Sequence, residues 1–420
     1  MTRSSKSIRV ALGMILLAAF VSAASAVPDS QTMDGIEVRF FATGKKVIPS
    51  MTAIGDWRIV DVKLPDLVLT NRGKTAVTLG GVEIIGKVAA ASAISIQLSG
   101  KDLLETIRAT AHLLNGNRPP ILSLQMSYGD VVIPEGFVSE NGVLGAGQSM
   151  VIPLSKASYL HYVGHSTLDA LDAVLTLKEE GEGGRSKRLT LPIRLTPYEV
   201  KGKYIFPLRG NLHLAFLPLS YIHHRGSHSQ EFAMDVVGAV QKVAASYLEI
   251  STPNPKKLAD YGIWGADILA MGDGIVAVIG DKFPEVRMSN PAVFSAPGYT
   301  TTLLKELSGT IGFTNAVAGN YVVIDHGNGE FSVYCHMREG SLRVNPGDKV
   351  KKSQVIGQVG NTGNSGAPHL HFQLMDSADF LTANGLPMMF ENVPNSSIIA
   401  EFPVQTNNLS FSDNLFIAVP

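Results

Sequence analysis

Short runs of strand-forming residues, separated by glycine-containing turns, recur through the first half of the chain and constrain its fold more than any other feature. Such runs with turn signals between them are typical of an all-β region of the β-sandwich type. A helix is expected over Lys101–Leu114, where apolar residues recur at helical spacing, and a second one over Tyr159–Leu171 is compatible with the pattern. The expected strands are Ile36–Ala42, Trp57–Val62, Asp66–Thr70, Val77–Ile85, Ser95–Leu98, Ile121–Met126, Ser149–Pro153, Ala173–Lys178 and Arg188–Leu195.

The overall composition excludes several classes of protein. A chain with 45% hydrophobic and 17% charged residues is not intrinsically disordered. Its formal net charge of −1 supplies no electrostatic footprint for nucleic acid. The single cysteine, Cys335, excludes an internal disulfide framework and a cysteine-based zinc finger. The 420 residues are enough for two or three domains, since a domain takes roughly 100–200 residues.

The first residues have the layout of a secretory signal peptide. Basic side chains precede the apolar run Val10–Ala23, and Ala24-Ser25-Ala26 fits a small-x-small cleavage site. This run is shorter than the roughly 20 residues that span a bilayer, although an uncleaved membrane anchor remains an alternative. We therefore expect residues 1–26 to be removed and the remaining, mildly acidic chain to be exported without a membrane span.

The amino-acid composition of the sequence changes near Pro197–Lys203. Beyond this stretch the chain has short β-runs, more glycine and eight of the eleven histidines. The expected organisation is therefore all-β dominated: a β-sandwich-like accessory domain over residues 27–200, and an antiparallel β-sheet domain with long loop inserts over residues 201–420. Two inserts, Ala239–Tyr261 and Asp281–Ala318, are expected around a cleft, because loops of this length are commonly functional.

Two histidines stand two residues apart in the segment from Pro368 to Leu374. If this segment is a strand, His369, His371 and Gln373 share one face and the intervening apolar side chains share the other. Paired imidazoles on one strand face suit metal binding next to acid–base chemistry. Taken alone, the pair is equally compatible with two exposed polar residues on a half-buried strand.

A third histidine ends a predicted β-hairpin. The Asn328-Gly329 dipeptide is a strong hairpin turn signal between the runs Tyr321–Asp325 and Phe331–His336. Strict alternation places His336 on the face of Tyr334 and Ser332, and Cys335 on the opposite face. We interpret Cys335 as a small core residue, because no basic neighbour that would activate its thiol is evident on its own face.

One carboxylate interrupts an otherwise apolar predicted strand. Asp235 lies within Phe232–Val237, where an isolated carboxylate is costly to bury unless a metal or hydrogen-bond donors hold it. The preceding residues include His223, His224 and His228. Asp235 is therefore a candidate metal ligand, and the alternative is a carboxylate bonded to backbone at a strand end.

Together these blocks resemble the lysostaphin/LytM-type zinc endopeptidases, which cut peptides in bacterial cell walls. The resemblance covers about residues 205 to 375. It includes, besides the His…Asp block, the Tyr334-Cys335-His336 block and Pro368-His369-Leu370-His371-Phe372, a valine- and glycine-rich run over Val344–Gly357 with its following turn, and a strand entry over Ala270–Val276.

The resemblance implies the roles of individual residues. Carried over from the family, His228, Asp235 and His371 hold one Zn²⁺ per chain, and His336 and His369 are catalytic. The first ligand departs from the common spacing of four residues before the Asp, a position that Glu231 takes here, whereas His228 stands seven residues before it. His224, Glu231 and His223 therefore remain alternatives.

The implied function is an exported zinc metalloendopeptidase, periplasmic or secreted, that hydrolyses stem or cross-link peptides of peptidoglycan. Three protein ligands leave one tetrahedral position open, as in catalytic zinc sites. Two alternatives stay open: a non-catalytic wall-binding or activating protein on the same scaffold, and a zinc protease of exported proteins. Peptidoglycan peptides are the expected partner, nucleic acid is not, and a regulatory protein partner is left open.

Overall fold

The computed structural model describes residues 30–54, 56–116, 130–157, 159–216, 224, 227–238, 255–286, 299–393, 398–401 and 415–419. The expected signal peptide, the run Ile121–Met126, His223 and most of the insert Ala239–Tyr261 lie outside these residues. None of the helices in the described ranges is long and apolar enough to cross a membrane.

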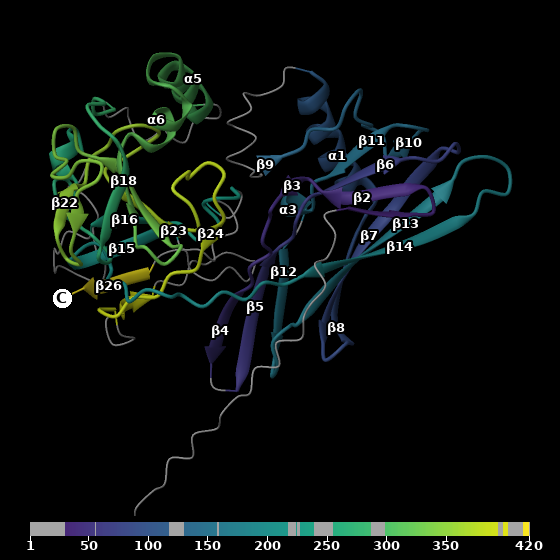
Figure 1. Ribbon diagram of the computed structural model, residues 1–420, viewed down its shortest axis with the longest axis horizontal. Coiled ribbons are helices and arrows are strands. Elements are labelled where there is room, and N and C mark those ends of the chain that lie inside the picture. Colours follow the sequence, from purple (N-terminus) through teal and green to yellow (C-terminus); the bar gives the residue numbers. More distant parts are fainter. Residues whose placement is uncertain are drawn as a thin grey trace, which may run out of the picture.

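The accessory region is built from several antiparallel sheets (Figure 1). A four-stranded sheet has the order β1 (Ser30–Met33), β2 (Ile36–Phe40), β6 (Leu67–Asn71) and β11 (Ser149–Ile152). A second sheet has the order β10 (Val143–Leu144), β7 (Val77–Val88), β13 (Ala170–Glu179) and β14 (Ser186–Arg194), with β8 (Ala91–Ser99) on β7. The smaller sheets are β12 (Tyr159–Gly164), β5 (Trp57–Lys63) and β4 (Ser50–Ile54), and the pair β3 (Ala42–Thr43) and β9 (Asp130–Val131).

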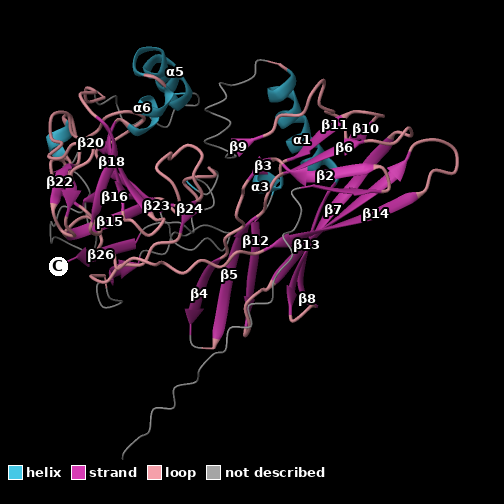
Figure 2. Cartoon of the chain, in the orientation of Figure 1, coloured by secondary structure: helices cyan, strands magenta, loops and turns pink. Residues whose placement is uncertain are grey.

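One apolar core joins these sheets. Inward side chains such as Val38 of β2, Ile84 of β7 and Leu160 of β12 belong to the same buried cluster. Helix α1 (Gly100–Asn115) adds Leu103 and Ile107 to this core, as its predicted helical spacing requires. The all-β expectation for this region is confirmed by these antiparallel sheets (Figure 2).

The helix considered over Tyr159–Leu171 is wrong. Residues Tyr159–Gly164 form β12 and pair with β5 in antiparallel register. Leu160 lies opposite Val62, and both are fully buried. Burial of these partners against a neighbouring strand outweighs the weak local preference for a helix.

A ten-stranded antiparallel sheet organises the second half of the chain (Figure 1). Its central strands are β19, β20, β23 and β16, and the small β24 also pairs with β23. In spatial order the strands are β21 (Lys349–Val350), β18 (Gly274–Gly280), β19 (Asn320–Asp325), β20 (Phe331–Met337), β23 (Leu370–Met375), β16 (Met234–Gly238), β15 (Gly210–Phe216), β26 (Leu415–Val419) and β25 (Ile398–Glu401), with β24 (Gly385–Leu386) beside β23.

Other elements surround this sheet. Strands β17 (Asp267–Leu269) and β22 (Val355–Gln358) form a separate antiparallel pair. The described part of the insert Asp281–Ala318 contains two helices, α5 (Tyr299–Ile311) and α6 (Phe313–Ala318). Among the described residues, short helices are also formed by α3 (Leu154–Ala157) and the 3₁₀ turn η2 (Leu258–Asp260).

The connection between the two regions is fixed to the β19–β20 hairpin by Glu330. This buried carboxylate accepts hydrogen bonds from the hydroxyls of Tyr198 and Tyr204, at 2.7 and 2.6 Å. The backbone N–H groups of Lys201 and Gly202 donate to the same carboxylate. Because its carboxylate accepts hydrogen bonds from four groups of the connecting chain, Glu330 holds that chain in one position relative to the hairpin.

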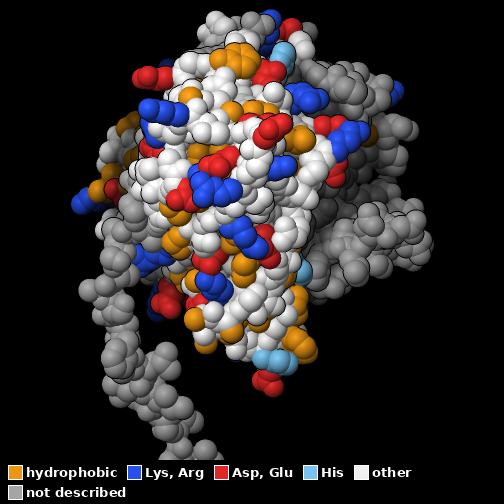
Figure 3. Space-filling model, turned by 90° about the vertical axis from the view of Figure 1, so that its right-hand side faces the viewer, with side chains coloured by type: hydrophobic (Ala, Val, Ile, Leu, Met, Phe, Trp, Pro, Cys, Tyr) orange, Lys and Arg blue, Asp and Glu red, His pale blue; other side chains and the backbone are white. Residues whose placement is uncertain are grey.

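The outer face of the accessory region carries both signs of charge. Figure 3 shows basic and acidic side chains interspersed over that face, without a continuous field of either sign among the described residues. Exposed side chains of the accessory sheets pair across strands, such as Arg188 with Glu83 at 3.0 Å and Arg72 with Glu37 at 2.7 Å.

Candidate metal centre

Three neighbouring strands place Asp235, His371 and Cys335 in one row across the sheet. Asp235 of β16 lies directly opposite His371 of β23, and His371 lies opposite Cys335 of β20. Directly opposed residues of antiparallel strands point to the same face, so these three side chains share one side of the sheet. Asp235 and His371 are each 4% exposed.

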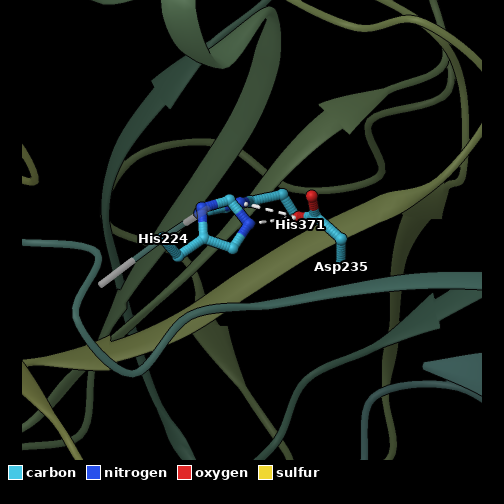
Figure 4. A group of neighbouring side chains, drawn as sticks. All are labelled: His224, Asp235 and His371. Atoms are coloured by element: carbon cyan, nitrogen blue, oxygen red, sulfur yellow. Dashed lines mark hydrogen bonds and ion pairs between the residues drawn. The ribbon is translucent and has the colours of Figure 1, made fainter. Parts of the chain in front are cut away.

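His224 joins this row from the loop that precedes β16. Its Nε2 lies 2.9 Å from Asp235 Oδ1, and Nδ1 of His371 lies 3.0 Å from the same oxygen. The three candidate ligand atoms are all within 4.8 Å of one another. Figure 4 shows the two imidazoles converging on the carboxylate.

His228, the predicted first ligand, lies outside this group of three. Its buried side chain instead lines a small cavity with accessory-region residues that include Phe41, Lys63 and Pro65. Burial, together with the charges of Lys45 and Lys63, holds the pKa of His228 well below its usual value. The structure thus brings Asp235 and His371 together as expected, but with His224, which spacing alone had left as an alternative, in place of His228.

Hydrogen bonds to the far side of each ring assign the histidine tautomers. His371 Nε2 is 3.1 Å from Gln373 Oε1, and the Gln373 amide nitrogen donates to the Ser229 carbonyl at 3.0 Å. Gln373 therefore presents its oxygen to His371, so that Nε2 carries the proton and Nδ1 the lone pair. The Nδ1 of His224 faces Gln230 Oε1 at 3.3 Å, which leaves its Nε2 as the lone-pair atom on the Asp235 side.

These donor atoms fit a divalent metal ion. Two imidazole lone pairs and one carboxylate oxygen meet in a buried space, where they repel one another unless a cation lies between them. Imidazole and carboxylate ligands in a set of three are typical of catalytic zinc. Gln373 would act as the outer partner that orients a metal-bound imidazole.

Two further histidines flank the group. The ring of His369 lies 4.6 Å from that of His336, and its Nε2 is 3.8 Å from Asp235 Oδ1. The Nδ1–H of His369 donates to the Ala367 carbonyl at 2.8 Å, and that of His336 donates to the Thr362 carbonyl at 2.8 Å. In both residues Nε2 therefore keeps its lone pair for proton transfer. Burial, followed by the nearby His369 and His371, holds the pKa of His336 well below its usual value.

The position of His336 depends on a break in strand alternation. The β19–β20 register shifts between the pairs Asn320–Met337 and Val322–Tyr334, and His336 has a φ of 58°. A bulge of this kind re-aims a side chain. The expectation that His336 shares the face of Tyr334 is wrong, because its ring instead lies beside His369, whereas the Tyr334 hydroxyl bonds Met271 N at 2.8 Å and Ser332 Oγ at 3.0 Å.

A buried polar network supports this bulge. Thr362 Oγ1 donates to the Met337 carbonyl at 2.9 Å and accepts from the Asn320 N–H at 2.8 Å. Gly319 and Gly363 allow the two backbones to approach, because a Cβ on Gly363 would lie 2.3 Å from Gly319 N. The close contact holds the Thr362 carbonyl where it can accept from His336.

Two other residues of the region have structural roles. Cys335 is buried among apolar side chains that include Val317 and Phe380, and burial, followed by the charge of Asp235, raises the pKa of its thiol. The two ring nitrogens of His326 face Asp273 O at 2.8 Å and Ser332 Oγ at 2.9 Å, and this imidazole therefore joins two loops.

Comparison with known proteins places peptidases among the proteins that are similar to this chain. The model of peptidase family M23 matches residues 259–383, and the resemblance to lysostaphin-type peptidases is thus confirmed for this C-terminal region. The matched range contains His336, His369 and His371, whereas Asp235 and His224 precede it.

Individual relatives match shorter segments. A peptidoglycan DD-endopeptidase, ShyA of Vibrio cholerae, is 40% identical over 84 residues, which cover 20% of this chain and 17% of that protein. The glycyl-glycine endopeptidase ALE-1 of Staphylococcus capitis is 41% identical over 68 residues, which cover 16% and 18%. The chain thus spans less than a fifth of these curated relatives. The solved catalytic domain of lysostaphin from Staphylococcus simulans is 26% identical, covers 33% of this chain and 85% of that one, and has a TM-score of 0.16.

Proposed function

We propose that this chain is an exported zinc-dependent endopeptidase that hydrolyses peptide bonds in the stem or cross-link peptides of peptidoglycan. One observation carries the proposal: Asp235 Oδ1 lies within 3.0 Å of a nitrogen of both His224 and His371, and two more histidines stand beside this group. The family match of the C-terminal region and the endopeptidase names of its relatives support a peptidase.

The ligands of the single zinc ion in this proposal are His224, Asp235 and His371. A zinc ion held there would supply a Lewis acid that polarises the scissile carbonyl and makes water a stronger nucleophile at neutral pH. Gln373 keeps the Nδ1 of His371 unprotonated, and Gln230 does the same for the Nε2 of His224. These partners fix the tautomers that metal binding requires.

His336 and His369 perform the proton transfers. Each donates its Nδ1–H to a backbone carbonyl and keeps a basic Nε2. One of the two accepts a proton from the attacking water, and the other stabilises the developing oxyanion or protonates the leaving amine. The lowered pKa of His336 keeps this residue neutral, and therefore able to accept a proton, at pH 7.

Zinc content and peptide release test this function together. Purified wild type should hold one zinc per chain and release peptides from purified peptidoglycan fragments. His371→Ala should lose both properties, because it removes a ligand. His369→Ala should keep the zinc, while kcat falls roughly 10²–10⁴-fold, the usual contribution of a general acid or base.

The outcomes separate the proposal from its rivals. A wild type that holds no zinc and releases no peptide would overturn the enzyme assignment. Binding to peptidoglycan without cleavage, by a chain that holds zinc, would favour a wall-binding or activating protein. Cleavage of exported proteins but not of peptidoglycan fragments would favour a protease with protein substrates.

A further inference from the structure

A loop of the accessory region, Thr43–Lys46, lies against the segment that leads into Asp235. We name residues 43–46 the clasp loop and residues 227–235 the metal loop. Lys45 Nζ of the clasp loop is 3.0 Å from Glu231 Oε2 of the metal loop. The side chains of Lys45 and Glu231 are only 7% and 3% exposed, so that this ion pair between the two regions is buried.

Neighbouring residues fix the clasp loop to the ten-stranded sheet. The N–H of Lys46 donates to Asn384 Oδ1 at 3.1 Å, and its ammonium group lies 2.5 Å from Asp376. Ile48, which follows the loop, is 2% exposed and packs into the core of the second half of the chain. Through this loop the accessory region contacts the second half of the chain at several points, and the ion pair of Lys45 with Glu231 reaches the metal loop directly.

The metal loop is held on a second side by β24. A Cβ on Gly385 would lie 2.6 Å from Ser229 O and 3.1 Å from Glu231 N, which shows how closely the two backbones approach. Contacts with Lys45 and with β24 therefore fix Glu231 and the backbone on either side of it.

Short paths connect this fixed segment to the ligands. The Ser229 carbonyl accepts from the Gln373 amide, whose oxygen in turn orients His371. Gln230 faces the ring of His224, and its carbonyl accepts from the N–H of Ala233, two residues before Asp235. A displacement of the metal loop would thus move the partners of all three ligands.

A buried ion pair is a poor source of net stability, because both charges lose their hydration. Such pairs are better suited to defining one arrangement of the groups around them. We propose that Lys45 is a positioning residue for the metal centre: by holding Glu231, the accessory region keeps the metal loop in the arrangement that binds zinc. This inference rests on the proposed function.

Zinc affinity of full-length variants, measured by competition with a chelator, tests this role. Lys45→Met should raise the zinc Kd about 10- to 100-fold, the effect of removing an outer partner of a metal site. Lys45→Arg should restore most of the affinity, since it keeps the buried cation. The matched control is Lys46→Met in the same loop, which loses only the contact with Asp376 and should bind zinc as wild type does.

A double variant removes the charge of Glu231 together with that of Lys45. Lys45→Met with Glu231→Gln should fold, with an apo melting temperature near that of wild type, and should still bind zinc about tenfold more weakly or worse. Wild-type affinity in this double variant, or in a folded Lys45→Met chain, would overturn the proposal. A wild type that binds no zinc would instead overturn the proposed function, and this inference with it.

Discussion

The core of the accessory region differs in polarity from the histidine row of the ten-stranded sheet, which comprises His224, Asp235 and His371. In both, strands bury alternate side chains, but those of the accessory core are apolar and those of the histidine row are polar. Along β13 the inward positions are Leu171, Ala173, Leu175 and Leu177, each at most 1% exposed. Along β23 one face is equally apolar, whereas the other buries His371 and Gln373. β23 is thus buried on both faces, whereas β13 exposes Thr176 and Lys178 on its outer face, and of the two strands only β23 buries polar groups.

This difference shows where each region gains its stability. Apolar side chains are stabilised by leaving water, at about 25 cal/mol per Å² of buried area. Buried imidazole and carboxylate groups lose free energy unless hydrogen bonds or a cation compensate them. The accessory core therefore depends on packing, whereas His224, Asp235 and His371 depend on their hydrogen-bond partners and, in the proposed function, on a metal ion. Four substitutions test this division.

Replacing His224 should have the largest effect. His224→Ala removes a ligand atom, and we expect zinc affinity to fall on the order of a thousandfold, equivalent to about 4 kcal/mol. His228→Ala is the matched control from the same loop, and should leave zinc affinity unchanged, because His228 faces the accessory region. Chelator competition measures both values, and the reverse ranking would restore His228 as the ligand.

In the accessory core, the corresponding substitution removes apolar packing instead of a ligand atom. Leu175→Ala should lower the free energy of unfolding by about 3 kcal/mol, within the usual range for a buried leucine. Zinc stoichiometry of the folded protein should stay at one per chain, because Leu175 contributes nothing to the histidine row. Chemical denaturation with parallel metal analysis provides the measurement. A loss of zinc from the folded variant would show that the two regions do not divide these roles.

Removing the outer partner of His371 should have an intermediate effect. Gln373→Leu keeps the side chain's bulk but lets the proton of His371 move to Nδ1, so zinc affinity should fall roughly 10- to 100-fold. Equal affinity of the leucine variant and wild type would mean that this hydrogen bond does not select the tautomer.

An exposed ion pair should have the smallest effect. Arg188 and Glu83 lie 3.0 Å apart on β14 and β7, with side chains that are 64% and 23% exposed. Arg188→Ala should change the free energy of unfolding by less than about 1 kcal/mol, since water already screens such a pair. Thermal unfolding at low and high salt checks this, and a larger, salt-dependent loss would contradict it.

Alternation and turn signals predicted many of the strands, such as β7 and β13, but not the order in which they form sheets. The β19–β20 hairpin follows from Asn328-Gly329, and α1 follows from its helical spacing. β12 was not recognised, because a short segment carries little preference of its own and its pairing with β5 depends on residues about 100 positions away.

The sequence predicted the positions of site residues on regular strands, but not of those in a loop or at a bulge. Asp235 and His371 each lie on a strand that the sequence indicates, but their meeting was implied by the family resemblance, and the structure pairs them directly. The choice between His224 and His228 depends on how a loop folds against the accessory region, for which spacing gives no signal. His336 lies beside His369 because of a bulge in β20, and a strict alternation of side chains along the strand does not predict a bulge.

The location of bound zinc tests the central claim most directly. Anomalous X-ray scattering at the zinc absorption edge, from crystals of the zinc-loaded full-length chain, would place the ion. The account predicts one zinc within about 2.0–2.2 Å of His224 Nε2, His371 Nδ1 and a carboxylate oxygen of Asp235. Zinc bound to His228, or no zinc between these three residues, would contradict it.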